Sequence, residues 1–133
     1  MATKFQTAGN LVKKVKTMMK YVPPWLRIAK ITVDNRTSFE LSNGSQIKPT
    51  AVSADAGRSE ALSLLVIDEA AFVDGLDELW TGLQPTLSTG GRCIAISTPN
   101  GAMGWFYDKW VEADQGLNDF NTCLLYTSDA ADE

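Results

Sequence analysis

A short apolar run that ends in two adjacent carboxylates is the feature that most constrains this chain. Residues 61–72 read ALSLLVIDEAAF, so the run closes on Asp68 and Glu69. A buried strand gains nothing from two acids at its end, because an unpaired buried charge is costly. The sequence therefore predicts a strand whose tip carries a functional pair of carboxylates.

The segments around this run alternate between strand and helix patterns. In chain order they are a strand over 61–67, a helix over about 75–87, a strand over 93–97 and a helix over about 103–113. Unbroken apolar strands that alternate with helices are typical of a parallel sheet covered on both faces. Ligands of such sheets bind at the carboxyl ends of the strands. The acidic pair ends the first strand, and Ser97 and Thr98 end the second, so we expect these side chains at one edge.

The residues before this unit predict a helix and a small antiparallel element. Residues 6–20 carry apolar side chains at helical spacing and stop before Pro23 and Pro24. The predicted core stripe of this helix consists of Leu11, Val12, Val15, Met18 and Met19. Residues 30–34 predict a strand, and residues 39–47, FELSNGSQI, predict a hairpin.

The register of this hairpin follows from its apolar residues. A two-residue turn at Asn43-Gly44 would place Ile47 on the face opposite Phe39. A three-residue loop with Gly44 in the left-handed conformation would pair Leu41 with Ser45 and Phe39 with Ile47. We prefer the longer loop, because it places the apolar residues on one face.

Composition limits the class of protein. The chain has 133 residues and 44% hydrophobic content, which is enough for one core. No apolar run approaches the ~20 residues of a membrane-spanning helix, and the N-terminus has no signal-peptide core, so we expect a soluble intracellular protein. Cys93 and Cys123 lack metal-type spacing and the chain has no His, which predicts free thiols and no zinc site.

Charge is distributed unevenly along the chain. Residues 1–60 hold ten Lys and Arg against four Asp and Glu, whereas residues 61–120 hold two against nine. This imbalance fits an ordinary solvated surface. It also fits a basic half that faces phosphate, either of a nucleotide or of a nucleic acid backbone.

Adjacent Asp and Glu at the tip of a buried strand are what a nucleotide hydrolase of the P-loop type needs. Asp68 would hold Mg²⁺, directly or through a water, and Glu69 would orient and polarise the attacking water. Ser97 and Thr98 could sense the γ-phosphate by hydrogen bonding. The alternatives are a helix-capping acidic pair and a simple turn over Ser97, Thr98 and the following Pro-Asn-Gly.

Four stretches together resemble the ATPase domain of the large subunit of tailed-phage terminases, the DNA packaging motor. They are FELSNGSQI, LLVIDEAAF, CIAISTPNG and GWFYDKW, and the resemblance covers roughly residues 5–120. It implies a P-loop NTPase-like α/β fold with an inserted hairpin. It also implies ATP and Mg²⁺ as cofactors, double-stranded DNA, the terminase small subunit and the portal as partners, an oligomeric motor, and the host cytoplasm as location.

The resemblance also implies residue roles. Asp68 matches the Walker B aspartate that serves magnesium, and Glu69 matches the catalytic glutamate. Ser97 and Thr98 match the motif that couples hydrolysis to DNA movement. Arg58 lies where similar proteins carry an arginine and is a candidate cofactor contact, although a solvated loop arginine is the alternative.

The chain departs from the family pattern in one important respect. The P-loop, GxxxxGK[ST], occurs nowhere in the sequence, so the phosphate cradle and its lysine are absent. We therefore expect residues 1–120 to be a partial ATPase domain that is inactive when isolated. Residues 121–133 are expected to lie outside the domain, because CLLYTSDAADE looks like a translated sequencing adapter or a disordered tail.

Two other functions remain open at this point. A DEAD or DEAH helicase also has an Asp-Glu strand, but such helicases usually continue with Ala-Asp or Ala-His, whereas Ala70, Ala71 and Phe72 follow here. A non-enzymatic module would use the acids only to cap a helix. The aromatic residues of the last helix, which are Trp105, Phe106, Tyr107 and Trp110, are expected in the core rather than on a base-stacking platform.

Overall fold

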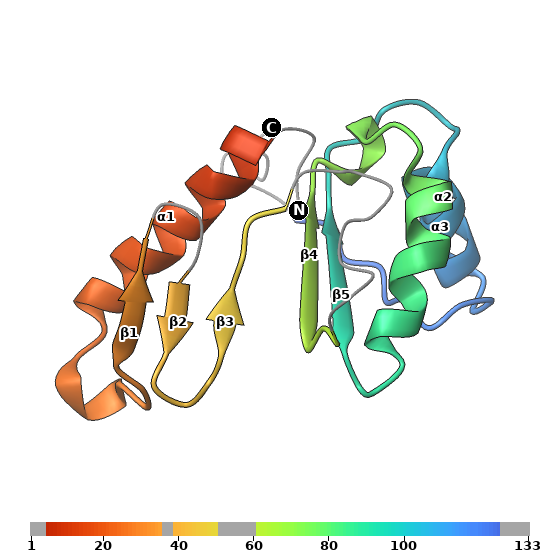
Figure 1. The fold of residues 1–133 in the computed structure, drawn as a ribbon. Coiled ribbons are helices and arrows are strands. Elements are labelled where there is room, and N and C mark those ends of the chain that lie inside the picture. Colours follow the sequence, from red (N-terminus) through yellow and green to blue (C-terminus); the bar gives the residue numbers. More distant parts are fainter. Residues whose placement is uncertain (1–4, 36–38, 51–60, 126–133) are drawn as a thin grey trace.

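The computed structural model describes residues 5–35, 39–50 and 61–125, which form a mixed α/β fold (Figure 1). Its elements fall into two groups. The N-terminal group contains α1 (Phe5–Tyr21), a 3-10 turn (Pro24–Leu26), β1 (Ile31–Asp34), β2 (Phe39–Leu41) and β3 (Gln46–Ile47). The C-terminal group contains β4 (Leu64–Asp68), α2 (Leu76–Leu83), β5 (Arg92–Ile96) and α3 (Trp105–Asp114). Among the helices described, none is long and apolar enough to cross a membrane.

Helix α1 forms as predicted and ends before the Pro23-Pro24 pair, but its buried face differs from the predicted stripe. Ala8 and Val12 are buried, whereas Met18 is 65% exposed, so the prediction that Met18 belongs to the core is wrong. The helix face that carries Ala8 and Val12 also carries Lys16. Lys16 Nζ lies 2.7 Å from Asp34 Oδ1 on β1. Residues at intervals of four share a helix face, and Met18 lies about 200° around the helix from Lys16.

The N-terminal sheet has the order β1-β2-β3 and is antiparallel throughout. Phe39 pairs with Ile47, and the Leu41 amide donates to the Ser45 carbonyl at 2.9 Å. Gly44 has a φ of 83°, and the Asn43 side-chain oxygen accepts the Ser45 amide at 3.1 Å. The three-residue loop and the predicted register are therefore confirmed, and Phe39 is fully buried.

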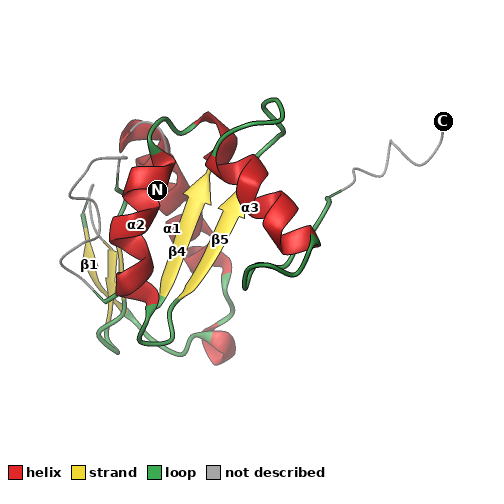
Figure 2. Ribbon diagram, turned by 90° about the vertical axis from the view of Figure 1, so that its right-hand side faces the viewer, coloured by secondary structure: helices red, strands yellow, loops and turns green. Residues whose placement is uncertain are grey.

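Strands β4 and β5 pair in parallel, with Leu65 opposite Cys93 and Asp68 opposite Ile96. Leu65 and Ile67 point into the main core, which the two helices α2 and α3 close on one side of the sheet (Figure 2). On the opposite face Ile94 and Ile96 are each 47% exposed. Helices α2 and α3 both pack on the core face, so the expected cover of the second face does not come from either of them.

Helix α2 is shorter than the predicted segment 75–87. It ends at Leu83 and continues as a 3-10 turn over Gln84–Leu87. Pro85 accounts for this change, because its ring has no N–H and clashes with the carbonyl four residues earlier. Helix α3 spans Trp105–Asp114, which lies within two residues of the predicted segment 103–113 at both ends.

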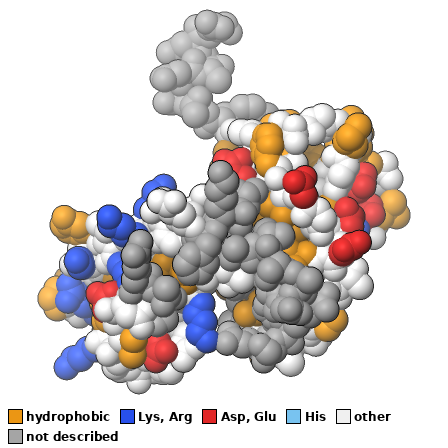
Figure 3. All heavy atoms as spheres, turned by 45° about the horizontal axis from the view of Figure 1, so that its top comes forward, with side chains coloured by type: hydrophobic (Ala, Val, Ile, Leu, Met, Phe, Trp, Pro, Cys, Tyr) orange, Lys and Arg blue, Asp and Glu red, His pale blue; other side chains and the backbone are white. Residues whose placement is uncertain are grey.

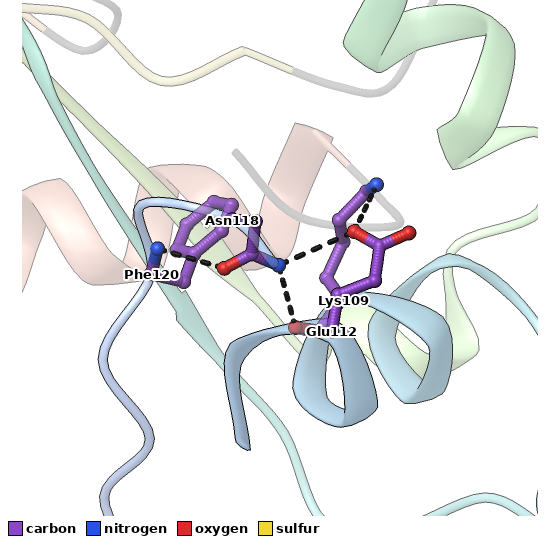
Figure 4. A network of polar contacts seen from close by, with 4 residues as sticks. All are labelled: Lys109, Glu112, Asn118 and Phe120. Atoms are coloured by element: carbon purple, nitrogen blue, oxygen red, sulfur yellow. Dashed lines mark hydrogen bonds and ion pairs between the residues drawn. The ribbon is translucent and has the colours of Figure 1, made fainter. Parts of the chain in front are cut away.

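The end of α3 is tied to the segment that follows it by a polar network (Figure 4). Asn118 Nδ2 donates to the Lys109 carbonyl at 2.9 Å, and Asn118 Oδ1 accepts the Phe120 amide at 2.9 Å. Lys109 lies 2.7 Å from Glu112, and this contact, together with Asn118, lowers the pKa of the Glu112 carboxyl. The network holds Phe120 in ring contact with Trp80 and Trp105. The side chain of Trp105 is 4% exposed.

Gly91 lies at a close backbone approach between the start of β5 and the segment before β4. A Cβ at this position would lie 2.0 Å from the Leu62 carbonyl oxygen and 2.9 Å from Leu87 Cδ2. The adjacent Arg92 amide donates to the Ser63 carbonyl at 3.0 Å, which holds the two segments together. No side chain fits between them.

Gly91→Ala is expected to lower the free energy of unfolding by about 1–3 kcal/mol, because the added methyl group must displace backbone. The matched control is Gly9→Ala in α1, where a Cβ meets nothing within 4 Å. That variant should be more stable by about 0.5–1 kcal/mol, because alanine is the better helix former. Urea denaturation of both variants measures the difference, and equal effects would contradict the packing assigned to Gly91.

The two cysteine thiols are free and differ in exposure, because Cys93 is partly buried and Cys123 is exposed. Burial raises the pKa of the Cys93 thiol to about 11, so the thiolate is scarce at neutral pH. Cys123 is exposed and serves as the internal control. With Ellman's reagent at pH 8 we expect Cys123 to react rapidly and Cys93 slowly, until denaturant equalises the two rates. Rapid labelling of both thiols in the folded chain would contradict the placement of Cys93.

Candidate active site

The acidic pair lies at the carboxyl edge of the parallel sheet. Asp68 is the last residue of β4 and is partly buried, and Glu69 follows it and is exposed. Ser97 directly follows β5, which ends at Ile96 opposite Asp68. The strand pairing thus brings the acidic and the hydroxyl strand ends to one edge, as the sequence predicts.

Glu69 adopts a strained backbone conformation. Its φ and ψ are 57° and 40°, and it is the only residue other than glycine with positive φ in the described part of the chain. This conformation costs a non-glycine residue about 1–2 kcal/mol. The residue redirects the chain from β4 into the 3-10 turn Ala70–Phe72, where the Phe72 amide donates to the Glu69 carbonyl at 2.9 Å.

The turn after Glu69 is held by contacts with the main core and with the loop that follows the neighbouring strand. The side chain of Ala70 is 2% exposed and belongs to the main core. The Ala71 amide donates to Ser97 Oγ at 3.1 Å, and Asn100 Nδ2 donates to the Ala71 carbonyl at 3.1 Å. Both polar groups of one residue are therefore held by the loop that follows β5.

Sequence reasoning missed Asn100 as a functional candidate. It treated the residues after Thr98 as ordinary turn formers. The available signal was an amide side chain four residues beyond the end of a strand that is followed by hydroxyl groups, but its partner lies 29 residues away. Thr98 is exposed, and Arg58 lies outside the described residues.

A cavity of about 620 Å³ opens between α1 and the end of β4. Its lining consists of Thr7, Asn10, Leu11, Lys13, Lys14, Thr17, Met18 and Asp68. Asp68 lies on the sheet face opposite the main core, because side chains alternate along β4 and Ile67 is the fully buried neighbour. Lysines of α1 and the carboxylate of β4 thus border one hollow.

The described residues contain no group of three or more His, Cys, Asp or Glu side chains that could hold a metal ion by themselves. Mg²⁺ does not require such a group, because it keeps several waters and binds through one or two carboxylates plus substrate phosphates. The Asp68 carboxylate fits that donor set. The phosphate cradle is not encoded in these 133 residues.

The charge asymmetry of the sequence is also spatial. Lys and Arg side chains gather over the N-terminal group of elements, and most Asp and Glu side chains lie over the C-terminal group (Figure 3). The exposed apolar side chains of the N-terminal group include Trp25 at 81% and Ile28 at 96% exposure. The two halves therefore present surfaces of different chemistry.

Comparison with known proteins supports the fold. No protein-family model matches the chain. Two solved structures of the large terminase ATPase domain of Thermus phage P74-26, one of them a point mutant, are similar at a TM-score of 0.53 and 23% sequence identity. Each match covers 80% of this chain, which spans about half of the neighbour, 49% of its length. The likeness shows a terminase ATPase-like fold.

The strain at Glu69 predicts opposite effects of the same substitution at two positions. Glu69→Gly should raise the free energy of unfolding by about 0.5 kcal/mol, because relief of the left-handed strain exceeds the added chain entropy. Glu78→Gly, at an exposed position of α2, should lower it by about 1 kcal/mol. Urea denaturation tests both, and a loss of stability at Glu69 as large as at Glu78 would contradict the strain.

Proposed function

We propose that this chain is part of the ATPase motor of a phage terminase large subunit, which hydrolyses ATP to move double-stranded DNA into a procapsid. The observation that carries the proposal is the meeting of two strand ends in a fold of this type. Asp68 and Glu69 end one strand, and Ser97 follows its parallel neighbour. A hydrolase that must hold Mg²⁺ and orient water needs both acids at such an edge.

In this proposal the two acids have different tasks. Asp68 is half-buried at the strand end and would be the Mg²⁺ ligand, directly or through a water. Glu69 is exposed and would accept a hydrogen bond from the attacking water. Bound Mg²⁺ would neutralise charge that develops on the phosphate oxygens.

Residues near the end of β5 would sense the γ-phosphate of the nucleotide by hydrogen bonding. Ser97 Oγ accepts the Ala71 amide and keeps its own proton available for donation. Thr98 is exposed beside it. Arg58 is proposed as a further phosphate contact.

A second segment must supply the P-loop in this proposal. Backbone amides and a lysine around the β- and γ-phosphates provide much of the binding in this class of enzyme. The exposed side chains of Ile94 and Ile96 support this proposal, because they offer an apolar surface on which that segment could pack. The proposed partners are DNA, bound through its phosphate backbone, the terminase small subunit and the portal, with several copies forming the motor.

Glu69→Gln tests the catalytic assignment in the ATPase that combines this chain with a P-loop. The amide keeps the size of the side chain but cannot take a proton or orient the water equally well. We expect ATP turnover to fall by about 10²-fold or more. The matched control is Glu78→Gln, the same chemical change at an exposed position of α2.

Nucleotide binding separates a catalytic defect from a folding defect. Glu69→Gln should bind Mg-ATP as the unchanged protein does, whereas Asp68→Asn should require a higher Mg²⁺ concentration. Unchanged ATP turnover in Glu69→Gln would refute the catalytic role of this residue. It would favour a non-enzymatic module with this fold.

A further inference from the structure

We propose that Asn100 is a positioning residue for Glu69, acting with Ser97 as a clamp on the backbone of Ala71. This inference rests on the proposed function, because positioning matters only if Glu69 acts on the reacting water. The clamp is defined by two hydrogen bonds, from the Ala71 amide to Ser97 Oγ and from Asn100 Nδ2 to the Ala71 carbonyl, each 3.1 Å long.

The clamp acts on the segment whose geometry determines the direction of Glu69. Ala71 is separated from Glu69 only by Ala70, which is anchored in the main core. With the Ala70 side chain and both Ala71 polar groups held, the peptide units after Glu69 have little freedom to rotate. The left-handed φ of 57° at Glu69 is then sustained by contacts outside that residue.

The chemistry of Asn100 suits this task better than that of the residues around it. Its amide nitrogen can donate to a carbonyl, whereas the ring of Pro99 has no donor and Gly101 has no side chain. Asn100 is exposed, so packing does not explain the position of its side chain. Its hydrogen bond joins the loop after β5 to the turn after β4 across 29 residues of sequence.

The clamp also links two parts of the candidate site. Ser97 belongs to the strand end that would respond to the nucleotide, and it holds the same residue that Asn100 holds. A shift of the loop after β5 therefore displaces Ala71 and changes the backbone at Glu69. The direction of the Glu69 carboxylate would follow the state of that loop.

The matched control for this clamp is Asn118. Its amide also donates to a backbone carbonyl, that of Lys109, at 2.9 Å (Figure 4). This contact lies at the end of α3 and outside the acidic edge. Asn100→Asp and Asn118→Asp both replace a donor by an acceptor of the same size. Asn118 also donates to Glu112 Oε2 at 3.3 Å, so Asn118→Asp adds a like-charge contact there and is the more severe change of the two.

The first measurement uses the full chain of 133 residues, labelled with ¹⁵N and ¹³C. The scalar coupling between the amide and α protons of Glu69 reports its φ, and amide exchange reports the protection of Ala71. Asn100→Asp and Ser97→Ala should change the coupling at Glu69 and accelerate exchange at Ala71. Ser97→Thr, which keeps the hydroxyl, and Asn118→Asp should leave both unchanged.

The second measurement is steady-state ATP hydrolysis by the ATPase that contains this chain. Asn100→Asp should lower kcat by about 10-fold or more, because a misdirected catalytic group loses rate steeply with small displacements. KM for ATP should remain near its original value, because Asn100 contacts only the turn after Glu69 in this proposal. Asn118→Asp should leave kcat unchanged after correction for any loss of folded protein.

The two measurements separate failure of the clamp from failure of the proposed function. An unchanged coupling at Glu69 in Asn100→Asp would overturn the clamp, whatever the kinetics. A changed coupling together with full turnover by Glu69→Gln would leave the clamp standing and refute the catalytic role. If the added charge prevents folding, Asn100→Ala removes the same donor without a charge and decides between these outcomes.

Discussion

Parallel pairing of β4 with β5 is the interaction on which the candidate site depends. Because the strands run in the same direction and in register from Leu64 opposite Arg92 to Asp68 opposite Ile96, their carboxyl ends meet at one edge. The pairing is supported by the core beneath it, where Ile67 is fully buried under α2 and α3. A shift of one residue would turn Asp68 into that core, where an unpaired carboxylate is costly. The register and the position of the acid are therefore selected together.

Local sequence rules predicted the structure correctly where residues that are close in sequence are also close in space. The hairpin register followed from the need to place Phe39 and Ile47 on one face, and Gly44 met the backbone requirement of the loop. The parallel pair is not local, and it was predicted by a rule for whole folds, because strands that alternate with helices are typical of parallel sheets. The helical pattern runs on to residue 87, whereas α2 ends at Leu83, because the ring of Pro85 disrupts the preceding helical turn.

Long-range contacts account for what the sequence did not reveal. The buried stripe of α1 was misplaced because an ion pair with Asp34 brings Lys16, a charged residue, onto the anchored face. Hydrophobicity alone favoured Met18, which is exposed. The role of Asn100 was invisible for a related reason, since its partner at Ala71 belongs to another strand end. In both cases a polar side chain contributes through a partner that only the fold brings near.

The strain at Glu69 and the clamp on Ala71 have one physical explanation. A left-handed glutamate persists only where its surroundings favour that conformation by more than its cost. Here those surroundings include the loop after β5, through Ser97 and Asn100, rather than β4 alone. Because the loop after β5 helps to hold the left-handed conformation of Glu69, a movement of that loop can release it. In the proposed function, such a release would change the direction of the Glu69 carboxylate when a phosphate is lost, which a relaxed residue at the end of a strand would not allow.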